Sequence, residues 1–165
     1  MNSYSFLRAF LRMRAYNSVN ENEGGFSMTT IQDVIDGKID IPECERLLGV
    51  KVVSGDLANG KVTCEWTIGP QHLNRAGIAL GGFTAAVADV AIGYAGALLV
   101  DADQGYSSIN LQTTFHKPLF VGTALFHATI KRKGRSIMYA EVEIEQSGKL
   151  VGDTVSSLMI LPKKA

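Results

Sequence analysis

The chain has 165 residues, with 16 basic and 16 acidic side chains and two cysteines. This length favours one domain that can bury a core. The balanced charge argues against a nucleic-acid or polyanion binder, which usually carries a basic excess. Cys44 and Cys64 have neither a metal-ligand spacing nor the density of a disulfide framework, which indicates a reducing compartment, the cytoplasm by default.

Residues 1–28 are interpreted as an N-terminal extension. Phe6, Leu7, Phe10 and Leu11 recur at helical spacing with arginines between them. The segment lacks the continuous apolar core and small-residue cleavage site of a secretory signal. An Arg-rich, acid-poor start is typical of an organellar transit peptide, but a peripheral amphipathic helix has the same pattern, and we favour the helix. We expect a single domain over residues 29–165.

Two short helices and a β-hairpin are predicted next. "TTIQDVIDGKI" is typical of a helix that Thr30 caps and Gly37 ends, and "IPECERLLG" adds a helical turn closed by Gly49. The Asn59-Gly60 pair is a hairpin signal between the strands "VKVVSGD" and "KVTCEWTI". The second strand alternates polar residues with a buried set, in which the cysteine is a small core residue: Val62, Cys64, Trp66 and Ile68.

Residues 80–100, "LGGFTAAVADVAIGYAGALLV", form a long apolar run with one carboxylate, Asp89, near its centre. From Phe83 to Val100 the run has about 18 residues, the lower limit for a membrane span. Asp89 would cost about 3 kcal/mol in a bilayer, and no second run of this length follows. We therefore interpret the run as a helix buried on nearly all sides by protein.

Four strand-like runs follow this helix: "YSSINLQTTFH", "TALFHATIK", "SIMYAEVEIE" and "LVGDTVSSLMIL". The first alternates an apolar set (Ile109, Leu111 and Phe115, with Thr113) against polar residues. Six mostly antiparallel strands with one long helix between the second and third indicate an α+β layer architecture. Because the helix has no charged face, we expect a curved sheet, and a second subunit, to enclose it.

The helix also carries two features of a chemical site. If it begins near Gly81-Gly82, its first amide N–H groups have no internal partners and can polarise a carbonyl, as in an oxyanion hole. Asp89 lies seven or eight residues further on, or about 11 Å at ~1.5 Å per residue, so one carbonyl cannot touch both groups. The face around Asp89 is made of small residues, which allows two antiparallel helices to meet and form composite sites: Ala85, Ala86, Gly93 and Gly96.

The pattern Asn-x-x-Gly-x-x-(His)-Gly-Gly followed by a helical Asp resembles the PaaI-like hotdog-fold acyl-CoA thioesterases, of the 4-hydroxybenzoyl-CoA thioesterase type. The matching residues are Asn74, Gly77, Leu80, Gly81, Gly82 and Asp89. The resemblance extends over about residues 40–162. It implies one long helix wrapped by a six-stranded sheet, assembled as a dimer or a dimer of dimers. It further implies an acyl-CoA substrate and no separate cofactor.

The resemblance also implies roles for single residues. Asp89 corresponds to the catalytic carboxylate, which acts as general base on water or as nucleophile. The Gly81 amide corresponds to the donor that polarises the thioester carbonyl, and Asn74 to the loop side chain beside it. Ser108 corresponds to the hydroxyl that positions water near Asp89 of its own subunit. Gly82, Leu80 and Phe83 then lie around the substrate.

One position departs from the pattern. Leu80 stands where the family commonly has histidine, and leucine cannot hydrogen-bond near the thioester. A non-catalytic acyl-CoA-binding protein on the same fold is therefore the alternative to hydrolysis. A hydratase ranks last, since related hydratases depend on a helix histidine and the central helix here has none. Asn74 has a structural alternative too, because asparagine also shapes turns.

Two histidines and one basic turn are further candidate binding groups. His116 and His127 face the polar sides of their strands with no third ligand spaced with them, so a metal site is not expected. The turn "KRKGR" can hold the phosphates of coenzyme A or can simply be a solvated hairpin. Its basic residues are Lys131, Arg132, Lys133 and Arg135. Pocket depth is expected to depend on Phe83, Tyr94, Phe115 and Met138.

Overall fold

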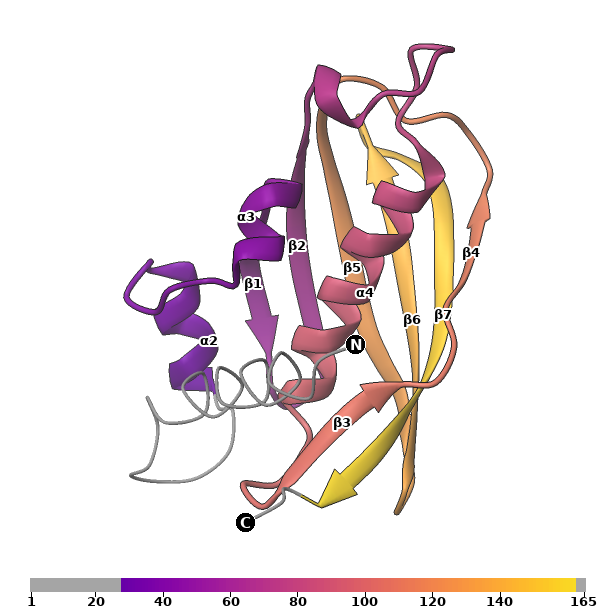
Figure 1. Ribbon diagram of the computed structural model, residues 1–165. Coiled ribbons are helices and arrows are strands. Elements are labelled where there is room, and N and C mark those ends of the chain that lie inside the picture. Colours follow the sequence, from indigo (N-terminus) through magenta and orange to yellow (C-terminus); the bar gives the residue numbers. More distant parts are fainter. Residues whose placement is uncertain (1–27, 163–165) are drawn as a thin grey trace, which may run out of the picture.

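One long helix, α4 (Gly81–Ala97), lies in the hollow of a curled antiparallel sheet (Figure 1). The computed structural model describes residues 28–162, so the predicted extension lies outside the described residues except for Met28. The strands are β1 (Val50–Asp56), β2 (Lys61–Ile68), β3 (Gln104–Ser108), β4 (Gln112–Phe115), β5 (Gly122–Lys133), β6 (Ile137–Gln146) and β7 (Lys149–Pro162). They run in the order β1-β2-β5-β6-β7-β3, with β4 also beside β7. The predicted α+β architecture is confirmed.

The predicted strand "YSSINLQTTFH" is broken into β3 and β4, which occupy one position at the sheet edge because both pair with β7. In the break, the side chain of Asn110 accepts the Ser157 amide N–H at 2.8 Å, and its backbone carbonyl accepts the Ser156 hydroxyl at 2.7 Å. A polar side chain thus replaces part of the strand ladder. The apolar set expected on a buried face is exposed in this chain: Ile109, Leu111 and Phe115.

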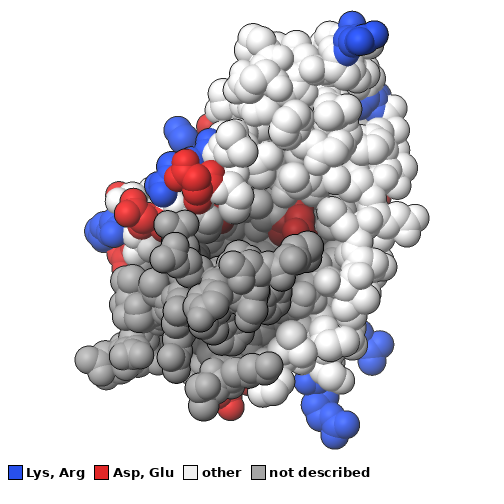
Figure 2. Space-filling model, viewed as in Figure 1, with Lys and Arg blue, Asp and Glu red and all other residues white. Residues whose placement is uncertain are grey.

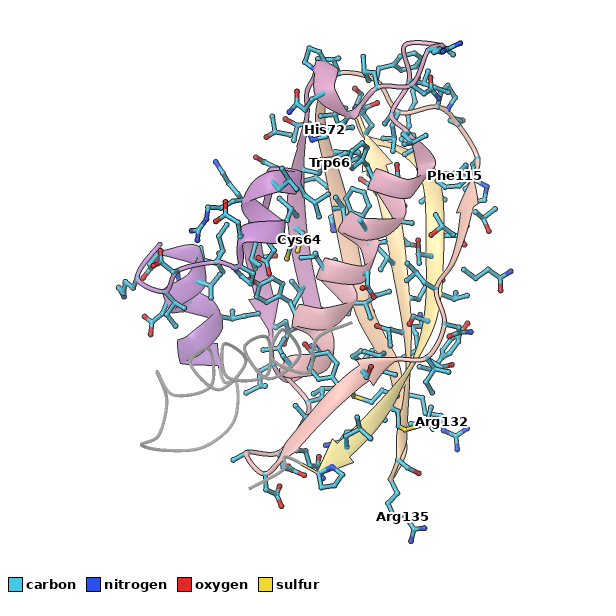
Figure 3. All side chains as sticks on the ribbon, in the orientation of Figure 1. Cys64, Trp66, His72, Phe115, Arg132 and Arg135 are labelled. Atoms are coloured by element: carbon cyan, nitrogen blue, oxygen red, sulfur yellow. The ribbon has the colours of Figure 1, made fainter. Side chains whose placement is uncertain are left out.

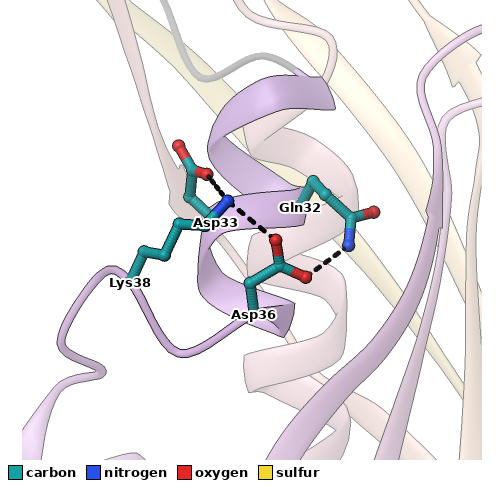
Figure 4. A network of polar contacts seen from close by, with 4 residues as sticks. All are labelled: Gln32, Asp33, Asp36 and Lys38. Atoms are coloured by element: carbon teal, nitrogen blue, oxygen red, sulfur yellow. Dashed lines mark hydrogen bonds and ion pairs between the residues drawn. The ribbon is translucent and has the colours of Figure 1, made fainter.

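Two short helices precede the sheet. α2 (Met28–Ile35) contains Thr30, so the prediction that Thr30 caps the helix is wrong: the helical run begins before it. Near the end of α2, Lys38 Nζ lies 3.1 Å from Asp33 and 2.8 Å from Asp36, and Gln32 also donates to Asp36 (Figure 4). These contacts lower the pKa of Asp36 and raise that of Lys38, but exposed pairs of this kind stabilise a fold little.

The second helix, α3 (Glu43–Leu48), ends at Gly49 as predicted. Gly49 adopts a left-handed φ of 71°, and its N–H donates to the Glu45 carbonyl at 3.0 Å. The Trp66 indole N–H then donates to the Leu48 carbonyl at 2.8 Å, which joins the end of α3 to β2. α3 is thereby fixed over the helix–sheet junction.

The core lies between the sheet and one side of α4. The fully buried helix residues Val87, Ala88, Ala91, Ile92 and Ala95 belong to the same cluster as Cys64, Trp66, Phe126, Val142 and Leu158. Burial raises the pKa of the Cys64 thiol far above its usual value, so Cys64 is a core residue, as predicted. In residues 28–162 no helix has the length and apolarity needed to cross a bilayer.

A buried carboxyl makes the stability of this fold depend on pH. Glu45 is 8% exposed, accepts the Tyr94 hydroxyl at 2.7 Å, and has a raised pKa because burial disfavours its charged form. A raised folded-state pKa means that its stabilising contribution is present at low pH and is lost as the pH rises through that value. Glu45→Gln keeps an acceptor for Tyr94 without a charge. We expect it to melt a few degrees above the wild type at pH 8 and alike at pH 4.

Thermal unfolding at both pH values measures this difference. Glu43→Gln is the matched control on the same helix, because the Glu43 side chain is 87% exposed. The prediction is contradicted if the wild type melts at a higher temperature than Glu45→Gln at pH 8 while the two melt alike at pH 4.

Candidate active site

The first turn of α4 presents unpaired backbone donors. The helix begins at Gly81, as predicted, and the amides of Phe83 and Thr84 donate to the Leu80 carbonyl at 3.0 and 3.3 Å. In the described part of the chain, the Gly81 and Gly82 amides have no backbone acceptor. A Cβ built on Gly82 would have no atom within 4 Å, so this end is open. Free N–H groups and the helix dipole favour negative charge there.

Gly81 lies directly against an aromatic ring. A Cβ built on Gly81 would come within 2.9 Å of the Phe115 ring of β4, at the start of α4 (Figure 3). Leu80 is about half exposed beside it, and Phe83 packs on the other side of the helix start against His72. The donors are therefore bordered by apolar side chains rather than by charges.

The other two residues expected to shape a pocket lie elsewhere. The Tyr94 hydroxyl bonds to Glu45 beneath α3, and Met138 is fully buried against Gly96 in the second half of α4. The structure therefore brings Phe83 and Phe115 to the helix start and leaves Tyr94 and Met138 in the core.

Asn74 organises the loop that leads into α4. Its Oδ1 accepts the Ala76 N–H at 2.8 Å, and its backbone N–H donates to the Ile78 carbonyl at 2.8 Å. Gly77 closes the turn with a φ of +74°, which favours glycine. The side-chain oxygen is thus used for loop shape. Among the described residues, the Nδ2 group of Asn74 makes no hydrogen bond.

Asp89 and Ser108 form a pair within one chain. The Ser108 hydroxyl donates to Asp89 Oδ1 at 2.9 Å, and both residues are exposed. Asp89 lies eight residues after Gly81 on a continuous helix, or about 12 Å along its axis. The structure therefore joins Ser108 to Asp89 but does not bring Asp89 to the Gly81 donors.

One stripe of α4 is left uncovered by the chain's own sheet. Gly82 and Asp89 are exposed and Ala85, Ala86 and Val90 are only partly buried, so the expectation of a helix buried on nearly all sides is wrong for a single chain. The physical reason is that a sheet curled round one side of a helix cannot reach the other. Few charged atoms lie on this face near the start of α4 (Figure 2).

His72 is a feature that the sequence pattern did not single out. It is 2% exposed, with its ring 5.3 Å from Trp66 and 5.2 Å from Phe83. Its Nδ1 accepts the Gly69 N–H at 3.0 Å, so the ring proton sits on Nε2, for which the described residues provide no partner. Burial lowers its pKa and keeps it neutral. The sequence alone does not show that a histidine in this turn contacts Trp66, Phe83 and Gly69.

The basic hairpin lies at the far end of α4 from Gly81. Lys131 pairs with Glu141 at 3.1 Å, and Lys133 donates to the Leu99 carbonyl. Arg132 and Arg135 extend from the end of the hairpin (Figure 3). Within one chain, the four basic residues therefore lie far from the Gly81 and Gly82 amides at the start of α4.

The two histidines considered for metal binding make pairwise contacts. His116 Nε2 lies 2.5 Å from Asp153, and His127 Nδ1 lies 3.1 Å from the Thr63 hydroxyl. Among the described residues, no three His, Cys, Asp or Glu side chains gather as metal ligands.

Comparison with known proteins shows what this chain is similar to. A model of the thioesterase superfamily matches residues 76–152. Human acyl-coenzyme A thioesterase 13 is 28% identical over 129 residues, which cover 76% of this chain and 91% of that protein. A candidate esterase from Caenorhabditis elegans is 30% identical over 112 residues, and the match covers 66% of each chain.

Solved structures show the same fold. A candidate thioesterase related to phenylacetic acid degradation, from Ralstonia eutropha, superposes with a TM-score of 0.73 at 24% identity, over 78% of this chain and 98% of that one. The fold is thus the hotdog fold that the motif in residues 74–89 predicts. The chain matches the thioesterase superfamily over residues 76–152 and is similar to acyl-coenzyme A thioesterases, which confirms the predicted resemblance and enzyme class at this level.

Two substitutions separate the possible roles of Asn74. Asn74→Asp keeps an oxygen acceptor for the Ala76 N–H but removes the Nδ2 donor, whereas Asn74→Ala removes both. If Nδ2 donates to the substrate carbonyl, both variants lose activity by roughly 10²-fold or more, as for loss of an oxyanion donor. The measurement is the rate of acyl-CoA hydrolysis. An aspartate variant with wild-type turnover would instead limit Asn74 to shaping the loop.

Proposed function

We propose that this protein hydrolyses an acyl- or aryl-CoA thioester to the free acid and coenzyme A. The observation that carries the proposal is that α4 has free amide donors at Gly81 and, on its uncovered stripe, the carboxylate of Asp89, which accepts a hydrogen bond from Ser108 of β3. The similarity to human acyl-coenzyme A thioesterase 13 supports the substrate class.

The chemistry needs a polarised carbonyl and an activated nucleophile. The Gly81 N–H donates to the thioester oxygen and stabilises the negative charge that develops there. Asp89 takes a proton from water while the water oxygen attacks the carbonyl carbon, and Ser108 orients that water. The C–S bond then breaks, and the thiolate takes up the proton to leave as coenzyme A. Direct attack by Asp89, followed by hydrolysis of the anhydride, gives the same products.

The site requires two copies of the chain. About 12 Å separates Gly81 from Asp89 along α4, so both cannot act on one carbonyl from one chain. Two α4 helices packed antiparallel along the uncovered stripe would bring the donors of one subunit to Asp89 of its partner. The exposed apolar residues Ile109 and Leu111 at the adjacent sheet edge support a buried contact there. A homodimer follows from this proposal, and a tetramer of two such dimers is the assembly that the family resemblance implies.

Coenzyme A would extend toward the basic hairpin. In an antiparallel dimer, the hairpin of one subunit lies at the end of α4 where the donors of its partner lie. Arg132 and Arg135 extend from the hairpin, and Arg135 lines a hollow of about 220 Å³ together with Gln104 and Ile160. Guanidinium groups suit phosphate recognition. Lys131 and Lys133 are engaged in contacts of their own and would add positive charge only.

An acyl-CoA-binding protein without turnover is the second candidate, and Leu80 is the observation that favours it. The leucine is half exposed beside the donors and supplies no hydrogen bond. Hydrolysis ranks first because Asp89 and the donors are present. For either function we propose the cytoplasm as the compartment, where the free thiols Cys44 and Cys64 remain reduced.

Release of thiol tests the proposal directly. The wild type is assayed with short, medium, long and aromatic acyl-CoAs beside Asp89→Asn, which keeps the size of the side chain and an acceptor for Ser108. We expect turnover of at least one substrate by the wild type, and a loss of roughly 10²-fold or more in the variant with folding and assembly intact. Saturable binding without thiol release would favour the binding protein. Equal turnover by Asp89→Asn would exclude Asp89 as the base or nucleophile.

The donor is tested by removing a single N–H group. Gly81→Pro deletes the amide hydrogen, and proline is tolerated at the first position of a helix. Leu80 has φ −65° and ψ 129°, which suits a residue before proline. Gly81→Ala is the matched control, since it adds a Cβ beside Phe115 but keeps the N–H. We expect the proline variant to turn over roughly 10²-fold more slowly than the alanine variant.

Mixing Gly81→Pro with Asp89→Asn tests the composite site. Random exchange makes half of the dimers mixed, and each of these has one intact site and one doubly defective site. The mixture is expected to recover about a quarter of the wild-type rate after subunit exchange. A site formed within one chain would give no recovery.

A further inference from the structure

We propose that His72 is a positioning residue that holds the start of α4, and with it the Gly81 amide, in place. The inference rests on the proposed function of Gly81 as carbonyl donor. It concerns a neutral, buried imidazole that itself need not touch the substrate. Three contacts of His72, all to the segments on either side of the loop that enters α4, carry it.

The first contact fixes the end of β2. His72 lies in η2 (Pro70–His72), a single turn that follows this strand, and its Nδ1 accepts the Gly69 N–H at 3.0 Å. This bond is possible only while Nδ1 carries no proton. The ring therefore has to stay neutral, with its hydrogen on Nε2.

The other two contacts reach the helix. The His72 carbonyl accepts the Leu80 N–H at 2.9 Å, and Leu80 directly precedes the Gly81 donor. The His72 ring also packs at 5.2 Å, edge to face, against Phe83 in the first turn of α4. One residue thus ties the end of β2 to both sides of the donor amide.

The chemistry of the ring indicates why histidine stands here. Its Nε2–H is the one buried side-chain polar atom without a partner among the described residues, and burying an unpaired donor destabilises a protein. A phenyl ring carries no such N–H and could also pack against Trp66 and Phe83, the two rings that His72 contacts. What phenylalanine lacks is the Nδ1 acceptor for Gly69. The unfavourable Nε2–H is therefore best explained by a need for the acceptor at this place.

Two substitutions of His72 test the ring contacts and the Nδ1 acceptor separately. His72→Phe keeps the ring contacts and loses the acceptor. His72→Asn keeps an oxygen at the Nδ1 position and loses most of the ring. We expect His72→Phe to melt at or above the wild-type temperature but to lose roughly tenfold in kcat, with KM changed less, because the donor acts mainly on the transition state. His72→Asn is expected to melt at a lower temperature and to keep kcat within roughly threefold.

The two variants are thus expected to differ in opposite directions: His72→Phe loses kcat but not melting temperature, and His72→Asn loses melting temperature but not kcat. A purely structural role of His72 would instead make kcat and melting temperature fall together. If activity follows melting temperature, so that Asn loses kcat and Phe keeps it, the proposal is wrong. Asp89→Asn is assayed alongside. If Asp89→Asn abolishes turnover but His72→Phe leaves kcat unchanged, the proposed function stands and only the positioning role of His72 fails.

Amide hydrogen exchange gives a readout that does not need turnover. In His72→Phe the Gly69 and Leu80 amides are expected to exchange faster than in the wild type, and in His72→Asn at wild-type rates. If the wild type releases no thiol, the proposed function fails, and these exchange rates still decide the role of His72. Unchanged rates in His72→Phe would overturn it.

Discussion

The structure depends on how an apolar helix is enclosed. α4 is covered by a curled sheet on the side of Val87, Ala91 and Ile92, and the opposite stripe stays open. Burying the covered side stabilises the fold, because each large apolar side chain removed from water contributes about 1.5–3 kcal/mol. The same packing fixes the direction of the helix, so the Gly81 amide and Asp89 keep a set spacing along one rigid element.

The fixed spacing of Gly81 and Asp89 along α4 connects the proposed dimer to the proposed reaction. A Cβ built on Gly93 would lie 3.5 Å from the Tyr106 hydroxyl and one built on Gly96 would lie 3.3 Å from Leu158, whereas one built on Gly82 would meet no atom within 4 Å. The small residues of α4 thus have two separate uses. The glycines in the second half of the helix let the sheet approach, and Gly82 near the start leaves open space on the uncovered stripe. In the proposed dimer, the contact that covers the apolar stripe also completes the site.

Sequence patterns predicted the features that depend on local rules. The alternation of Val62, Cys64, Trp66 and Ile68 predicted a strand with one buried face, and the glycine pair predicted the start of α4. Contacts between distant segments were not predictable in this way. The break between β3 and β4 depends on the contact of Asn110 with β7, and the position of His72 depends on its separate hydrogen bonds with Gly69 and Leu80. Phe115 alternates like a buried residue, yet its partner is a helix start rather than a core.

Leu80 supplies no hydrogen bond beside the glycines, so other groups of the candidate site would have to polarise a bound carbonyl. In the proposed function no histidine stands beside the glycines, so carbonyl polarisation would fall to backbone N–H groups, whose direction depends on how the surrounding chain is held. Asp89 is exposed in the single chain, where water competes with every polar contact it makes. A second subunit over the open stripe would exclude that water and strengthen the interactions of both Asp89 and the amides. On the proposed function, full activity therefore requires the assembled dimer, and on the proposed role of His72 this buried neutral residue maintains the geometry that a motif histidine would otherwise share.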